Sequence, residues 1–225
     1  MTKHTVKQPH VTTAARTVGV IKPFFDPSIK GFRPPKLSIS GTGFWIKDKN
    51  IFITCAHVIQ HLLGQPMEVT GMLVVGGNGQ EYKKATINSL DLSHDIAVLQ
   101  VDADSDYILS QNHTGLELNS EQLQVSEEVA YAGFPFGDKL LNPRHSPTYA
   151  EGVIGQEIID GVTQKWVQIS GPVVGGYSGS PIVLKESGKL IGMVSNSPSD
   201  EAGSANIFRA VHWKHIKATV DLFGS

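Results

Sequence analysis

The sequence predicts an all-β protein, either a barrel or a sandwich, that ends in one amphipathic helix. About a dozen short runs rich in β-branched and aromatic residues follow one another along the chain, and Gly, Pro, Asn and Asp separate them. Long stretches with helical periodicity are scarce before the C-terminal end. The fold class therefore depends on strands.

The expected strands divide into two groups of equal number. The first group comprises residues 16–25, 41–47, 50–55, 67–75, 81–90 and 95–101. The second group comprises residues 127–135, 149–158, 164–170, 180–186, 189–196 and 205–211. The polar stretch at 112–124 is typical of a linker, so we expect one half at 16–115 and a second half at 116–225.

The C-terminal segment, residues 212–224, differs from the rest in its periodicity. Trp213, Ile216, Val220 and Phe223 recur at helical spacing, which predicts a closing helix with one apolar face. His212 and His215 fall in the same segment, and we expect both to be solvated.

Composition limits the partners. The 225 residues, 40% of them hydrophobic, can bury one substantial core or two small ones. The formal net charge is −2 and no long run carries one sign, so we expect no nucleic acid and no anionic membrane as partner. No window approaches the ~18 apolar residues of a membrane-spanning helix.

The single cysteine and the N-terminal residues bear on location. Cys55 has no second cysteine to pair with, which excludes an intrachain disulfide and favours a reducing compartment or a bacterial origin. Residues 1–15 are polar and basic without the apolar region of a secretory signal. We expect a cytoplasmic protein with a flexible tail at 1–15.

Three residue types occur in an order that predicts nucleophilic catalysis. His57 follows one strand, Asp95 begins another, and Ser178 lies between glycines ahead of a third. A serine hydroxyl needs an imidazole to accept its proton and a carboxylate to orient that imidazole. The α/β-hydrolases use the order Ser, Asp, His and a G-x-S-x-G turn, and neither feature fits here.

Five stretches carry a resemblance to a known family. They are TCAHVI (54–59), HDIAVLQV (94–101), GFPFG (133–137) with EGVIGQE (151–157), GGYSGSPIVLKESGKLIGMVSN (175–196) and NIFRAVHWKHIKATVDLFG (206–224). In this order they resemble the trypsin-like serine proteases of the chymotrypsin fold, and most closely the HtrA/Deg-type protease domain. The resemblance covers residues 16–224 and implies a double six-stranded β-barrel with the catalytic cleft between the barrels.

The resemblance assigns roles to the glycine-rich loop. It implies that Ser178 is the nucleophile and that the backbone N–H groups of Gly176 and Ser178 form the oxyanion hole. Ser180 stands where the family tolerates Gly or Ser, so we interpret it as structural.

Two features depart from the family pattern. Tyr177 replaces the aspartate that digestive proteases pair with a newly cut N-terminus, so we expect no activation by that ion pair. HtrA-like members usually continue into a PDZ domain, whereas this sequence ends at Ser225, and we expect no such module here.

The resemblance also implies a substrate pocket without charge. Its lining would be Gly171, Pro172, Val173, Val174, Ser195, Asn196, Ser197 and Asn206. An uncharged lining favours an apolar residue before the scissile bond. Glutamyl endopeptidases share the GxSGSP signature, but they carry a histidine where this chain has Val194, which argues against their specificity here.

The sequence thus predicts a serine endopeptidase that cleaves polypeptides through His57, Asp95 and Ser178 and an acyl-enzyme. The alternatives are a non-hydrolytic module that binds extended peptides and a latent protease that needs an activating partner or homo-oligomer. No cofactor or metal is expected, because the H-V-I-Q-H spacing of His57 and His61 lacks the glutamate of zinc proteases.

Overall fold

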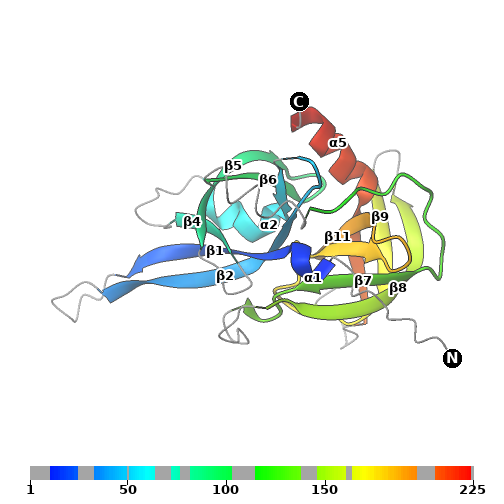
Figure 1. Cartoon of the computed structure of the whole chain (residues 1–225), viewed down its shortest axis with the longest axis horizontal. Coiled ribbons are helices and arrows are strands. Elements are labelled where there is room, and N and C mark those ends of the chain that lie inside the picture. The colour runs from blue at the N-terminus through cyan, green and yellow to red at the C-terminus, as the bar shows by residue number, and fades with distance from the viewer. Residues whose placement is uncertain are drawn as a thin grey trace.

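Two closed antiparallel barrels lie side by side in the described part of the chain (Figure 1). The structure is a computed structural model, and it describes residues 11–24, 33–49, 51–63, 72–76, 82–102, 115–137, 146–160, 164–196 and 206–223. Each barrel contains six strands, and one helix ends the described chain. The predicted fold class, a double six-stranded β-barrel with a C-terminal helix, is confirmed.

The first barrel closes in the order β1-β2-β3-β6-β5-β4. Its strands are β1 (Ala15–Phe24), β2 (Arg33–Trp45), β3 (Phe52–Thr54), β4 (Met72–Gly76), β5 (Lys83–Asp91) and β6 (Ile96–Val101). A single helical turn, α2 (Ala56–Ile59), and a 3-10 turn, η1 (Gln60–Leu62), follow β3. This places α2 at the end of a strand whose three residues are all buried.

The second barrel closes in the order β10-β11-β12-β9-β8-β7. Its strands are β7 (Glu128–Gly133), β8 (Thr148–Asp160), β9 (Gln164–Ser170), β10 (Pro181–Leu184), β11 (Leu190–Asn196) and β12 (Ile207–His212). Nonpolar side chains of these strands fill its interior, among them Tyr131, Ile169 and Phe208. The glycine-rich loop at 171–180 connects β9 to β10 and therefore belongs to this barrel.

Strand β2 begins earlier than the sequence predicts. We expected a strand at 41–47, whereas β2 starts at Arg33 and includes Pro34 and Pro35. Proline lacks the N–H that a strand ladder uses, which argues against a strand. The pairing of β1 with β2 shifts register between Lys22 and Phe24, and the two prolines fall within that irregularity.

The segment between the barrels, which includes most of the predicted linker, contacts both of them. Ile46 forms an isolated bridge with Leu116, and Leu118 forms another with Leu190. A continuous hydrophobic cluster extends from the interior of the first barrel to residues of β11 and β12, including Met193 and Val211. The barrels are therefore packed against each other through apolar side chains.

Helix α5 (Trp213–Phe223) confirms the predicted closing helix, with two corrections. Trp213, Ile216 and Val220 are buried as expected, but the last member of the predicted stripe, Phe223, is 42% exposed. His212 is the last residue of β12 and is fully buried, with Nε2 3.2 Å from Glu157 Oε1, so the expectation of a solvated histidine is wrong.

His215 is also not free in solvent. It lies on α5, is partly buried, and stacks on His94 with ring centroids 3.9 Å apart. The stack joins the closing helix of the second barrel to the turn between β5 and β6 of the first.

The predicted flexible tail at 1–15 is wrong for its last residues. Val11–Ala14 form a short helix, α1, and Val11, Ala14 and Ala15 are fully buried in the hydrophobic cluster between the barrels. Burial of these apolar side chains fixes the segment against the barrels. Residues 1–10 lie outside the described residues.

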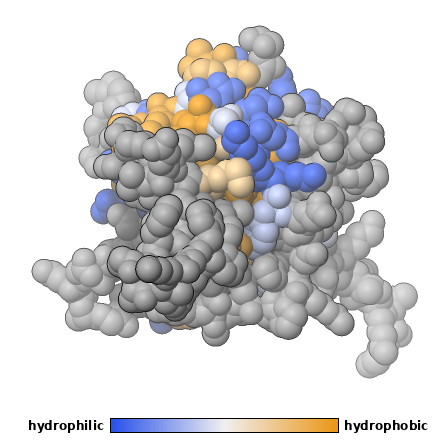
Figure 2. All heavy atoms as spheres, turned by 90° about the vertical axis from the view of Figure 1, so that its left-hand side faces the viewer, coloured by the Kyte–Doolittle hydropathy of each residue, from blue (hydrophilic) through white to orange (hydrophobic). Residues whose placement is uncertain are grey.

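The described surface is mixed in polarity. Viewed from the side of the β1–β2 hairpin, hydrophobic and hydrophilic residues meet in the upper part of the molecule (Figure 2). Within the residues described, no helix combines the length and the hydropathy that crossing a bilayer requires.

Candidate active site

Strand pairing brings His57 and Asp95 together. β3 pairs with β6, with Thr54 opposite Ala97, so the same register continued past both strands sets Ala56, which precedes His57, opposite Asp95. The backbone N–H of Ala56 donates to the carbonyl of Asp95 at 3.2 Å and fixes this approach.

Two hydrogen bonds join the two side chains. The backbone N–H of His57 donates to Asp95 Oδ1 at 2.9 Å, and His57 Nδ1 lies 2.8 Å from Asp95 Oδ2. The imidazole side chain is 44% exposed and the carboxylate 18%. A carboxylate on Nδ1 selects the tautomer with the proton on that nitrogen and leaves Nε2 as the acceptor.

Asp95 is further held by its backbone and by the second barrel. Its φ of 56° lies in the left-handed region, which aspartate tolerates better than most residues. Ser195 Oγ donates to Asp95 Oδ2 at 2.5 Å. Burial by itself would raise the pKa of Asp95, but the hydrogen bonds from His57 and Ser195 outweigh it and lower the pKa.

Glycines shape the loop that carries Ser178. Gly176 has a φ of 100° and Gly179 a φ of 86°. A Cβ at Gly176 would lie 2.3 Å from the carbonyl oxygen of Phe134, and a Cβ at Gly179 would lie 1.9 Å from that of Thr42. Only glycine meets both the backbone angle and the close approach at these two positions.

The orientation of the loop leaves two amides unpaired. The carbonyl of Gly175 accepts from the backbone N–H of Phe136 at 2.6 Å, so the N–H of Gly176 on the same trans peptide points the opposite way. Within the described residues, the N–H groups of Gly176 and Ser178 donate to no acceptor. Two free amides one residue apart are a suitable donor pair for an anionic oxygen.

The Ser178 hydroxyl contacts the second barrel in this structure. Its Oγ donates to the carbonyl of Ser195 at 3.4 Å, a long hydrogen bond, while Ser195 Oγ contacts Asp95. Ser195 therefore contacts both Ser178 and the carboxylate of Asp95. Among the described contacts, no hydrogen bond joins the Ser178 hydroxyl to the His57 ring.

Aromatic packing anchors the same loop. Tyr177 is 5% exposed and packs edge to face against Tyr131, with centroids 5.6 Å apart. Tyr131 in turn donates its hydroxyl to the carbonyl of Pro172 at 2.5 Å. Ser180 is fully buried, so its hydroxyl faces no solvent. The side chain at position 177 thus holds the loop from inside the barrel.

Cys55 lies beside the His57–Asp95 pair. Its thiol donates to the carbonyl of Val194 at 3.1 Å, and burial raises its pKa well above the ordinary value. The ligand atoms of Cys55, His57 and Asp95 lie within 4.8 Å of one another. A protonated thiol and an occupied His–Asp pair are poor metal ligands.

The residues predicted to line the substrate pocket are only partly brought together. The backbone N–H of Gly171 donates to the carbonyl of Asn206 at 2.8 Å, so these two segments adjoin. Val173 packs in the core of the second barrel. Ser197 and the side chain of Asn196 lie outside what the structure describes. The pocket as a whole stays a prediction.

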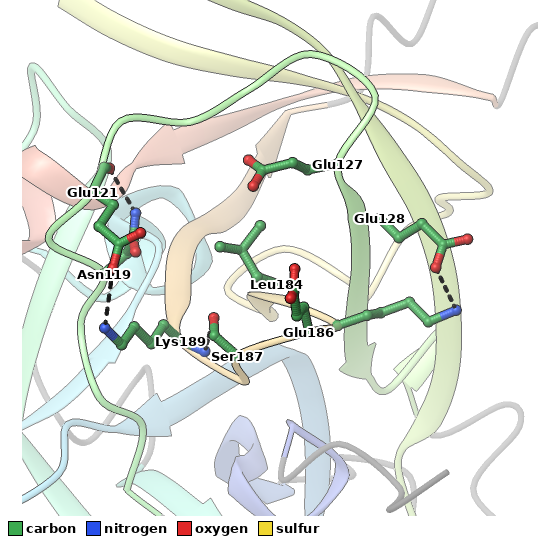
Figure 3. A pocket seen from close by; sticks show the side chains of 9 residues that line it. Asn119, Glu121, Glu127, Glu128, Leu184, Glu186, Ser187 and Lys189 are labelled. Atoms are coloured by element: carbon green, nitrogen blue, oxygen red, sulfur yellow. Dashed lines mark hydrogen bonds and ion pairs between the residues drawn. The ribbon is translucent and has the colours of Figure 1, made fainter. Parts of the chain in front are cut away.

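A hollow of about 490 Å³ adjoins the His57–Asp95 pair. It is lined by His57, Leu92, Ser93, Asp95, Trp166, Ser195 and Arg209. A larger hollow, about 700 Å³, lies elsewhere on the second barrel among Glu121, Glu127, Glu128, Lys185 and Lys189 (Figure 3). None of His57, Asp95 and Ser178 lines the larger hollow, so size does not identify the reactive site.

Sequence reasoning missed several residues of this cleft. Ser195 was predicted to line the substrate pocket, not to bind Asp95, which lies 100 positions away in the chain. Trp166 and Arg209 lie on β9 and β12 and reach the cleft only because the barrel curves. No local pattern marks them, since each is a single residue within an ordinary strand.

Comparisons with known proteins agree with the fold. A family model described as a trypsin-like peptidase domain matches residues 41–193. The probable periplasmic serine endoprotease DegP-like of Halomonas elongata is 30% identical over 170 residues, which are 75% of this chain and 31% of that protein. The uncharacterized protein y4bJ of Sinorhizobium fredii is 27% identical over 159 residues, 71% of this chain and 22% of that protein. The chain thus spans less than a third of the length of these curated relatives.

Solved structures show the same fold. The active form of the Rv3671c protease from M. tuberculosis matches with a TM-score of 0.67 at 20% identity, covering 100% of this chain and 88% of that one. The inactive form of Rv3671c, with a serine replaced by alanine, gives a TM-score of 0.64 at 20% identity and covers 99% and 94%. Together with the family model, which spans more than half of the residues, these findings show that the chain belongs to the trypsin-like peptidase family.

Proposed function

We propose that the protein is a serine endopeptidase in which Ser178 is the nucleophile, His57 the general base and Asp95 the residue that orients His57. The single observation that supports this most is the His57–Asp95 pair, with Nδ1 2.8 Å from Oδ2 and Nε2 without a hydrogen-bond partner among the described residues. An imidazole held on one side by a carboxylate can accept a proton on the other.

The proposed reaction follows from these positions. Ser178 Oγ attacks the carbonyl carbon of the substrate while His57 Nε2 takes the hydroxyl proton. The N–H groups of Gly176 and Ser178 stabilise the negative oxygen of the tetrahedral intermediate. His57 then gives the proton to the departing amine, an acyl-enzyme forms, and water attacks it with His57 again as the base.

Substrate preference is the finer part of the proposal. Because the predicted pocket at 171–174, 195–197 and 206 contains no charged residue, we propose an apolar residue before the scissile bond. The constitutive packing of Tyr177 supports a loop that needs no newly cut N-terminus.

Incubation with a mixture of peptides of known sequence tests the proposal. Mass spectrometry of the products should show internal cleavage after apolar residues, and the Ser178→Ala protein should show none. Cleavage that persists in the Ser178→Ala protein would refute the assignment of the nucleophile.

One observation supports a second candidate function, a latent protease. The Ser178 hydroxyl donates to the Ser195 carbonyl, and a rotation of the side chain is needed to direct it at His57. In this candidate a partner protein or a second copy of the chain favours the rotated state. Specific activity that rises with protein concentration, or appears only with a partner, would favour latency; activity that is constant on dilution would favour the competent enzyme.

The cytoplasmic location expected from the sequence stays a prediction, because the Halomonas relative is described as periplasmic. Fractionation of cells that produce the full-length protein tests it.

A further inference from the structure

The hollow beside His57 contains a charged residue that the proposed reaction does not use. Arg209 lies on β12 and is exposed in the hollow, together with Trp166 of β9 and Leu92 of the turn after β5. In the part of the chain that the structure describes, Arg209 takes part in no ion pair and no side-chain hydrogen bond. An arginine in a cleft without a carboxylate partner is available to a ligand.

Strand register explains why Arg209 faces the cleft. β12 alternates, with Phe208 and Ala210 buried inside the second barrel and Arg209 between them directed outward. Arg209 stands opposite Asn196 of β11, the residue after Ser195. The guanidinium therefore projects on the same side of the barrel as the reacting groups.

The carboxylates near the hollow are already engaged. Asp95 is bonded to His57 and Ser195, and Asp91 is bonded to Ser93 and to His94, with its Oδ2 2.6 Å from His94 Nδ1. Neither contacts Arg209. Among the described residues, the Arg209 guanidinium is thus left without a direct carboxylate partner.

The rest of the lining suits a side chain with an apolar stem. Trp166 is partly buried with part of its ring accessible, and Leu92 is 60% exposed at the edge. An indole and an aliphatic side chain can cover the methylene groups of a glutamate while the guanidinium binds its carboxylate with two hydrogen bonds.

We propose that Arg209, with Trp166 and Leu92, forms a subsite beside the reacting groups that binds a carboxylate of the polypeptide substrate. The enzyme then prefers segments that carry an acidic residue within a few positions of the scissile bond. This inference rests on the proposed peptidase function and names its substrate class. The carboxylate can belong to a glutamate or aspartate side chain or to the C-terminus of the peptide.

Peptide sets distinguish these sources. In one series a single glutamate moves from four residues before to three residues after the bond that is cut, and matched series carry glutamine or lysine at that place; all C-termini are amidated. We expect kcat/KM to be about three- to tenfold higher for glutamate than for glutamine at one position. The glutamine series is also measured with free C-termini, and a kcat/KM that is higher for the free than for the amidated peptide identifies the C-terminal source.

Variants test whether Arg209 is responsible. Arg209→Gln should remove the glutamate-to-glutamine ratio, and Arg209→Glu should favour lysine instead. Lys189→Gln removes the same charge at the other hollow and should keep the ratio of the unaltered protein. An equal glutamate-to-glutamine ratio in the unaltered protein and in Arg209→Gln would overturn the proposal, as would a ratio of one in the unaltered protein.

Two further measurements test the proposal without the Arg209→Gln variant. If Arg209→Gln does not fold, the glutamate-to-glutamine ratio of kcat/KM is measured in the unaltered protein at increasing salt. An exposed ion pair weakens between about 0.05 and about 0.5 M salt, so the ratio should fall over this range, and a ratio that does not change would contradict the proposal. The Ser178→Ala protein, which cannot cleave, should bind the glutamate peptide about three- to tenfold more tightly than the glutamine peptide. Such binding without hydrolysis by the unaltered protein would refute the peptidase function and keep the subsite; hydrolysis without any charge preference would do the reverse.

Discussion

The first barrel holds its reactive residues through side chains, whereas the second barrel holds its own through the backbone. His57 and Asp95 are joined by two hydrogen bonds to the carboxylate. Ser178 is placed by a loop whose glycines adopt positive φ and whose carbonyls bind Phe136 and Thr42. In the proposed reaction we therefore expect the first barrel's contribution to depend on charge and tautomer, and the second barrel's contribution to depend on backbone shape.

Ser195 is the exception that connects the two halves. It belongs to β11 of the second barrel, yet its hydroxyl binds the carboxylate of the first barrel and its carbonyl accepts from Ser178. The hydrogen bonding of the His57–Asp95 pair therefore depends on how the two barrels are placed relative to each other.

Removing the nucleophile should have the largest effect. Ser178→Ala should lower kcat by at least about 10⁴-fold while the free energy of unfolding changes by less than about 0.5 kcal/mol, since the hydroxyl makes one long hydrogen bond among the described residues. Peptide hydrolysis and urea denaturation measure the two quantities. Ser180→Ala is the control and should keep activity; if it alone abolishes hydrolysis, the assignment of the nucleophile is wrong.

Changing the carboxylate tests the first barrel. Asp95→Asn should lower kcat by about 10⁴-fold, because an amide on Nδ1 favours the wrong imidazole tautomer. Asp91→Asn alters a similar Asp–His contact outside the cleft and should cost less than tenfold. Equal losses in the two variants, measured as steady-state kcat, would show that orientation of His57 is not the function of Asp95.

Adding a methyl group to the loop tests the second barrel. Gly176→Ala should lower kcat by about 10²-fold, because the new Cβ would meet the Phe134 carbonyl and displace the amide donor. Gly175→Ala is the matched control, since a Cβ there meets nothing within 4 Å. If both variants retain full activity, backbone shape does not limit the second half of the site.

Ser195→Ala removes the hydrogen bond between Ser195 and Asp95 that connects the two barrels, and of the four changes it should have the smallest effect. Loss of this hydrogen bond raises the pKa of Asp95, which is lowered in the folded protein. A lowered pKa stabilises the fold above the unfolded value, about 3.9, and this stabilisation is lost as the pH falls through the folded pKa. Ser195→Ala should therefore lower the free energy of unfolding by about 1–2 kcal/mol at pH 7 and by less at pH 3. Urea denaturation at both pH values measures this, and a pH-independent loss would contradict the role.

Most strands of this fold are predictable because each strand has a recognisable local pattern of residues in the sequence. The alternating runs gave the positions of most strands, and the residues after β3 and before β6 were candidates because each stands at a strand end. The predicted strand at 41–47 is shorter than β2, and Pro34 and Pro35 argue against a strand before it. The shift in the β1–β2 register leaves these two prolines outside the regular pairing, and this shift is visible only once both strands are placed. α1 has four residues, which are too few for a helical pattern of apolar residues to be recognised in the sequence.

The remaining features depend on contacts between distant segments. The burial of His212 beside Glu157 and the bond from Ser195 to Asp95 arise where strands 55 and 100 positions apart meet. In the sequence, Arg209 has the pattern of an ordinary exposed strand residue. Only closure of the barrel brings it to the same hollow as His57. Single-sequence patterns carry no information about such pairs, so the sequence could suggest His57, Asp95 and Ser178 as candidates but could not predict the contacts that hold them.

Covalent labelling measures the central claim most directly. A fluorophosphonate reacts with a serine only when a base removes its proton and donors stabilise the resulting oxyanion, so the labelling rate reports both barrels at once. We predict one adduct per chain at Ser178 in the isolated protein, unchanged in Ser180→Ala and slowed by orders of magnitude in Asp95→Asn. A folded protein that labels at another serine, or labels at Ser178 equally fast without the Asp95 carboxylate, would contradict it.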